Sequence, residues 1–182
     1  MFVHWGVYSV TGGEFRGHMP PNSAEWMMNR AMISIADYKT ENVDKFNPTK
    51  FDAQAFVKLA KDAGMKYLVI TAKHHDGFSM FHSKCSPYNV VDATPFKRDV
   101  MKELAEASRE QGIRFGFYYS QCQDWHHPGG KGKQLGQDDS TRQLLPVRPG
   151  EGGSRDQATA NRVWPHCHLL VGHATAHEQR GL

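Results

Sequence analysis

The sequence lacks the features that mark several classes of protein. Its three cysteines are an odd number without a C-x-x-C pair, a pattern that predicts neither a disulfide framework nor a zinc knuckle. No hydrophobic run has the length of a membrane span, and no internal repeat is visible. The net charge is only +3, with basic residues scattered among acidic ones, so we expect no nucleic-acid partner and no membrane surface. With 182 residues, the chain forms one domain or part of a larger one.

The first residues carry neither the basic nor the apolar stretch of a secretion signal. Residues 1–10 are instead aromatic and β-branched, which predicts a strand ending near His4, Trp5 and Gly6. Because the chain opens inside a strand, we expect the native polypeptide to continue upstream. The compartment and the oligomeric state stay open.

Strand-like and helix-like segments alternate up to residue 130. Further strands are predicted at residues 67–70 and 113–119, amphipathic helices at 51–63 and 99–111, and short helices at 23–30 and 34–46. In the helix at 51–63, one face is expected to carry Phe51, Phe56, Leu59, Ala60 and Ala63. This order predicts parallel strands joined by right-handed crossovers. The fold class is therefore α/β, best described as a partial (β/α)8, TIM-like barrel, since about three strands cannot close one.

Polar and aromatic residues follow each predicted strand. Four of these places combine an aromatic ring with a hydrogen-bonding group: His4–Trp5, Glu25–Trp26, Tyr119 and Asp124–Trp125. In addition, the second strand ends in the run His74–His75–Asp76. In α/β folds, ligands bind at the carboxyl ends of parallel strands. We therefore expect these side chains to form a common site, although each pairing alone also fits ordinary core packing.

Two ligand chemistries fit such a site. A sugar ring packs its C–H face on aromatic side chains, while its hydroxyls need partners such as imidazole and carboxylate. Alternatively, His4, His74, His75 and Asp76 could hold the metal of a metal-dependent barrel hydrolase. Adjacent residues of a strand point to opposite sides, however, so a metal site would need a bend between His74 and His75. A non-catalytic carbohydrate-binding fragment is a third possibility.

Four motifs together resemble the α-L-fucosidases of glycoside hydrolase family 29: Phe2-Val3-His4-Trp5-Gly6, Glu25-Trp26, His74-His75-Asp76-Gly77-Phe78 and Phe117-Tyr118-Tyr119-Ser120. The resemblance covers residues 1–130, the amino-terminal part of the catalytic domain. It implies a (β/α)8-like domain, retaining hydrolysis of terminal α-L-fucose from fucosylated glycans, and no metal or organic cofactor. It also implies that full-length relatives are secreted, periplasmic or lysosomal.

The resemblance assigns roles to seven residues. His4, His74 and His75 would hydrogen-bond the fucose hydroxyls, Trp5 and Trp26 would flank the ring, Glu25 would support the site, and Tyr119 would line its floor. The family's nucleophile is an aspartate in a later Trp-Trp-Asp or Trp-x-Asp strand end, and the acid/base follows it. Neither motif is present, and because retaining glycosidases need both carboxyl groups, we expect this chain to be inactive.

The composition changes at residue 131. All ten Phe, six Tyr and eight Met precede it, so residues 131–182 are predicted to be an irregular or disordered tail. Residues 160–182 can also be encoded by codons that, read one base later, give a run containing Cys-Trp-Trp-Asp-Thr-Pro. The tail is therefore hypothesised to be the product of a frameshift near residues 130–133.

Overall fold

The computed structural model describes residues 1–17, 19, 23–121, 123–128 and 130. The prediction for residues 131–182 falls outside this part of the chain. The described residues form a parallel sheet of three strands, β1 (Phe2–Val3), β2 (Tyr67–Lys73) and β3 (Arg114–Tyr119), in the order β1-β2-β3. This confirms the predicted α/β arrangement. Strands that lie side by side in chain order suit an arc of a barrel better than a doubly wound sheet, whose strand order reverses.

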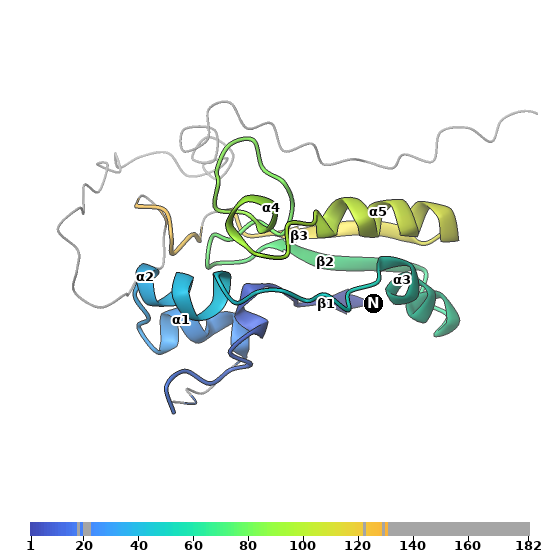
Figure 1. Ribbon diagram of the computed structural model, residues 1–182. Coiled ribbons are helices and arrows are strands. Elements are labelled where there is room, and N and C mark those ends of the chain that lie inside the picture. Colours follow the sequence, from blue (N-terminus) through green and yellow to red (C-terminus); the bar gives the residue numbers. More distant parts are fainter. Residues whose placement is uncertain (18, 20–22, 122, 129, 131–182) are drawn as a thin grey trace, which may run out of the picture.

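Two amphipathic helices connect the strands and pack against each other and the sheet (Figure 1): α3 (Ala53–Asp62) and α5 (Val100–Gln111). Each begins at an aspartate whose side chain accepts a backbone N–H three residues later, Asp52 from Ala55 and Asp99 from Lys102, both at 3.0 Å. Gly112 ends α5 in the left-handed conformation that glycine adopts most readily (φ 73°).

The buried face of α3 agrees with the prediction in part, since Phe51 and Phe56 pack against the core and Ala60 is buried. Its buried residues are Ala53, Val57 and Ala60, whereas Leu59 is 64% exposed. Of the predicted residues, Leu59 and Ala63 are exposed, and the fully buried Val57 extends the core-facing side instead.

Short helical segments gather at the end of the sheet where the strands terminate (Figure 1). They are η1 (Val7–Ser9), η2 (Ala24–Trp26), α1 (Met27–Arg30), α2 (Ile35–Tyr38), a π-helical turn η3 (Lys39–Val43) and α4 (Val90–Ala93). Ser34 caps α2 by accepting the Asp37 N–H at 3.0 Å. The helices predicted at 23–30 and 34–46 are thus present, each as two short consecutive segments.

The loop between β2 and α5 is folded rather than open. It contains α4, and Ser79 bridges both Lys73 and Asn89. Cys85 is disulfide-bonded, which the odd cysteine count did not predict. Among the described residues, no helix combines the length and apolar composition that crossing a bilayer requires.

Candidate functional site

The two adjacent histidines lie in a tight turn directly after β2. The turn is closed by the Gly77 N–H, which donates to the His74 carbonyl at 3.1 Å, and Gly77 has φ +77°. A Cβ on Gly77 would lie 2.3 Å from an oxygen of Asp124, so only glycine fits. The turn brings the His74 and His75 rings to 4.2 Å between centroids. It supplies the bend that a shared site requires.

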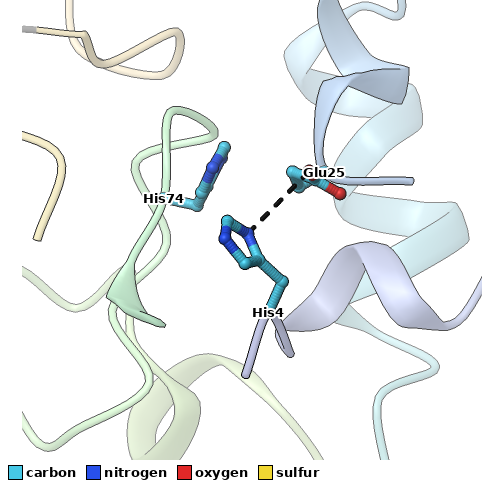
Figure 2. A group of neighbouring side chains, drawn as sticks. All are labelled: His4, Glu25 and His74. Carbon is cyan, nitrogen blue, oxygen red and sulfur yellow. Dashed lines mark ion pairs between the residues drawn. The ribbon is translucent and has the colours of Figure 1, made fainter. Parts of the chain in front are cut away.

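His4 and Glu25 join this pair from two other segments. His4 follows β1, Glu25 lies in η2, and His4 Nδ1 is 3.8 Å from Glu25 Oε1. One ligand atom from each of His4, Glu25 and His74 lies within 4.8 Å of the others. Figure 2 shows the His4 ring pointing between Glu25 and His74. Four of the seven predicted residues therefore meet at one end of the sheet.

Aromatic rings surround the histidines. Tyr118 stacks on His74 with 5.5 Å between centroids and an interplanar angle of 28°, and it lies 6.0 Å from His4. On the other side, the Trp26 ring is 5.1 Å from His75 and 5.4 Å from the fully buried Trp125. Trp26 and Trp125, both expected at the site from the sequence, thus belong to the cluster, as does Tyr118, in whose place the sequence interpretation chose Tyr119.

The structure places Trp5 and Tyr119 differently from the prediction. The Trp5 ring lies 5.1 Å from Phe51 and 5.6 Å from Phe46, against the core. The Tyr119 ring lies under the Lys73 ammonium, 5.2 Å from it. Alternation along β3 places adjacent tyrosines on opposite faces, so Tyr118 is the one that lies beside His4 and His74.

Although its ring faces the core, Trp5 helps to position His4 through its backbone. Thr71 Oγ1 accepts the Trp5 N–H at 3.1 Å and donates to the Trp5 carbonyl at 2.9 Å. Since the single hydroxyl proton of Thr71 is used there, the Tyr8 hydroxyl must donate in its 3.1 Å contact with Thr71. A residue of β2 therefore fixes the segment that carries His4.

A second hydrogen-bond chain determines which nitrogen of His75 carries a proton. The Ser120 hydroxyl donates to the Gln123 carbonyl at 2.7 Å. Ser120 must therefore act as the acceptor in its 2.7 Å contact with His75 Nδ1. The hydrogen is on Nδ1, so neutral His75 keeps its lone pair on Nε2.

The charges of the cluster follow from burial and proximity. Burial lowers the pKa of His74 to about 4, and the neighbouring His75 and His4 act in the same direction. Burial and the Lys73 ammonium also lower the pKa of His75. For Glu25, burial opposes ionisation, but the hydrogen bond from Ser23 and the nearby histidines outweigh it and lower its pKa. At neutral pH, His74 and His75 are therefore neutral imidazoles beside the Glu25 carboxylate.

Asp76 does not join its neighbours. Its carboxylate is 1% exposed and accepts hydrogen bonds from the Tyr38 hydroxyl at 2.8 Å and from the Phe78 N–H at 3.1 Å. Burial raises the pKa of Asp76 to about 6. The hypothetical metal set of His4, His74, His75 and Asp76 is therefore not assembled. Among the described residues, the group with metal-ligand proximity is His4, Glu25 and His74.

A buried ion pair between Lys73 and Asp124 supports the site, and the sequence did not predict this contact. Lys73 Nζ lies 2.8 Å from Asp124 Oδ2 and donates to the Ser120 carbonyl at 3.0 Å. Asp124 also accepts the backbone N–H groups of His126 and His127. The pair joins the end of β2 to the loop after β3, and nothing in local sequence signals a contact of that range.

The comparisons with known proteins agree with one another, because the matched family model, relatives and solved structures are all α-L-fucosidases. A family model described as Alpha-L-fucosidase matches residues 1–161. A putative α-L-fucosidase of Caenorhabditis elegans is 33% identical over 144 residues, and the human plasma α-L-fucosidase is 36% identical over 138. Each match covers 70% of this chain and 28% of the relative. The chain thus spans little more than a quarter of these relatives' length.

Solved structures agree with these matches. Unliganded α-L-fucosidase AlfC from Lactobacillus casei is 53% identical with a TM-score of 0.69, covering 71% of this chain and 39% of that one. An α-L-fucosidase from Vibrio sp. strain EJY3 is 46% identical with a TM-score of 0.68, covering 71% and 22%. AlfC has also been solved with its α-L-fucose product, and a mutant of it with Fuca(1,6)GlcNAc.

Proposed function

Because this chain belongs to the α-L-fucosidase family, we propose that it carries the sugar-binding part of a retaining α-L-fucosidase. Its ligand would be a terminal α-L-fucose on a glycan. The observation that carries the proposal is the meeting of His4, Glu25, His74 and His75 beside the Trp26 ring. These groups come from three separate segments and lie where α/β enzymes bind ligands.

The cluster has the chemistry that a sugar requires. Neutral imidazoles can each donate and accept a hydrogen bond, and the Glu25 carboxylate accepts, so together they suit several neighbouring hydroxyls. His75 would accept through Nε2, because its Nδ1 is held by Ser120. The rings of Trp26 and Tyr118 supply apolar faces for the sugar's C–H groups. Trp5 would act indirectly, through the backbone that carries His4.

We further propose that this chain binds the sugar without hydrolysing it. A retaining mechanism needs two carboxyl groups about 5 Å apart, one of them free to act as nucleophile. Asp76 is enclosed with Tyr38, and Asp124 is paired with Lys73. Glu25 therefore remains as the one carboxylate of the cluster in the described part of the chain, and a second would have to come from elsewhere in a full-length relative.

Binding is tested with L-fucose, using D-fucose as the mirror-image control, by saturation-transfer NMR on the 182-residue chain. We expect transfer to L-fucose only, and its loss in His75→Ala. The matched control is His82→Ala, which removes an exposed ring of another loop, 3.8 Å from Asp92. Equal signals from both enantiomers, or an unchanged signal in His75→Ala, would contradict the proposal.

Catalysis is tested with 4-nitrophenyl α-L-fucopyranoside. We expect no release of nitrophenol by the chain alone. A chimera of residues 1–130 with the remaining carboxyl-terminal part of AlfC should hydrolyse it, and His74→Ala in that chimera should abolish turnover. The alternative, a non-catalytic carbohydrate-binding fragment, predicts that the folded chimera binds L-fucose but stays inactive.

A further inference from the structure

The sugar cluster also has the composition of a metal site. We propose that His4, Glu25 and His74 bind a divalent transition-metal ion, with Zn²⁺ as the reference ion, in the space proposed for the sugar hydroxyls. The metal site itself is independent of the proposed function. Only its competition with the sugar rests on that function.

The three side chains form a suitable ligand set. Two imidazoles and one carboxylate are a set that binds Zn²⁺ with an open fourth position. Their ligand atoms lie within 4.8 Å of one another, and the pair from His4 and Glu25 is at 3.8 Å. Tetrahedral ligands about 2.1 Å from the ion lie roughly 3.4 Å apart. The His4–Glu25 contact therefore needs to shorten by about 0.4 Å and the other two by at most about 1.4 Å, distances within reach of side-chain rotation.

The side chains that must move are the accessible ones. The His4 and Glu25 side chains are 39% and 15% exposed, whereas His74 is 4% exposed and held by the turn after β2. His74 would provide the fixed ligand, and the other two would close on the ion. Figure 2 shows the His4 ring already pointing between its two partners.

The electrostatics favour a cation. Glu25 is an acidic ligand whose carboxylate brings a negative charge to the two imidazoles, 3.8 Å from His4 Nδ1. The buried ammonium of Lys73 is paired with Asp124 at 2.8 Å. Nδ1 of His74 has no hydrogen-bond partner among the described residues, so no hydrogen bond to that atom fixes the tautomer of the ring. Because no group in the described part of the chain hydrogen-bonds His74 Nδ1 and so orients the ring, the site should bind Zn²⁺ more weakly than a structural zinc site does.

The test is a titration of the 182-residue chain with Zn²⁺ in competition with a chromophoric chelator. Wild type should bind one ion more than His74→Ala, and Glu25→Gln should weaken that ion's binding at least 10-fold, roughly the loss that even outer-shell changes cause. His82→Ala should match wild type. The histidines beyond residue 130 are present in every variant, so they contribute equally to all titrations.

Two outcomes decide the matter. Equal stoichiometry and affinity in wild type, His74→Ala and Glu25→Gln would overturn the proposal. If circular dichroism shows that His74→Ala is unfolded, the partly exposed Glu25→Gln variant decides it, since replacing a carboxylate by an amide changes little in packing.

Competition separates this inference from the proposed function. Zn²⁺ at saturation should abolish the transfer signal of L-fucose in wild type, and a chelator should restore it. If Zn²⁺ binds as described but L-fucose never binds, the metal site stands and the proposed function fails. If L-fucose binds while the variants leave Zn²⁺ binding unchanged, the metal site fails alone.

Discussion

Burial of Asp76 should make the stability of the fold depend on pH in an unusual direction. The carboxyl is 1% exposed, and burial raises its pKa from 3.8 to about 6. A raised folded-state pKa means that the folded chain binds this proton more tightly than the unfolded chain. The resulting stabilisation is complete below about pH 4 and is lost as the pH rises through about 6.

The magnitude follows from the difference between the two pKa values. A difference of about two pH units at 1.36 kcal/mol each gives about 3 kcal/mol. Replacing Asp76 by Asn removes the ionisation and keeps the size of the side chain. It also alters the hydrogen bonds to Tyr38 and Phe78, but that cost does not vary with pH. Asp76→Asn should therefore gain stability relative to wild type between pH 4 and pH 7, by about 2–3 kcal/mol in the free energy of unfolding.

Comparing the two proteins also removes the contribution of His74. Its pKa is lowered from 6.5 to about 4, so its stabilisation is complete above pH 6.5 and is lost as the pH falls through about 4. This trend opposes that of Asp76, but it is common to both proteins. Urea unfolding followed by circular dichroism at both pH values gives the two differences. Asp62→Asn on the exposed face of α3 is the control, and a wild type to Asp76→Asn difference that is the same at pH 4 and pH 7 would refute the reasoning.

Three further substitutions test the fold and the site. Asp99→Ala removes the cap of α5 and should lower the free energy of unfolding by about 1 kcal/mol; no change in urea midpoint would contradict the capping role. Leu104→Ala, at a fully buried position, should lower it by about 3 kcal/mol by the same assay, and a loss below 1 kcal/mol would mean that α5 is not packed as described. Ser120→Ala releases the His75 ring and should weaken L-fucose binding about 5-fold, the worth of one hydrogen bond, while Ser120→Thr retains binding; equal affinities in an NMR titration would exclude this positioning role.

Local signals made most of the fold predictable. Asp52 and Asp99 mark helix starts, and Gly64 and Gly112 follow the helix ends. These signals act over three or four residues, so sequence alone locates them. The order of strand, helix and strand then restricts the topology to parallel crossovers. The existence of a site after β2 was predictable for the same reason, because an apolar run ends there in two histidines.

Contacts between segments far apart in the sequence determine which side chains reach the site, and these contacts could not be predicted from local patterns. The pairing of β2 with β3 shifts register between Thr71 and Lys73, and no local pattern shows which of Tyr118 and Tyr119 then reaches the histidines. Trp5 looked like a sugar platform but packs with Phe51, because apolar area is buried wherever the core has room for it. Asp76 looked like a ligand, yet its partner Tyr38 lies 38 residues away.

The cluster is held by three connections that all lie within the described part of the chain. Thr71 ties β2 to the backbone after β1, Ser120 ties His75 to the loop after β3, and the Lys73–Asp124 pair joins β2 to the same loop. None of them needs a strand beyond β3. The positions of the imidazoles are therefore set by this arc of sheet itself, which is why we expect L-fucose and Zn²⁺ to bind a chain whose described part forms three strands. Removing Lys73 would leave the Asp124 charge buried and unpaired, at a cost of about 3–5 kcal/mol. Lys73→Met should therefore weaken the binding of both L-fucose and Zn²⁺, whereas Glu25→Gln should weaken Zn²⁺ binding more than L-fucose binding.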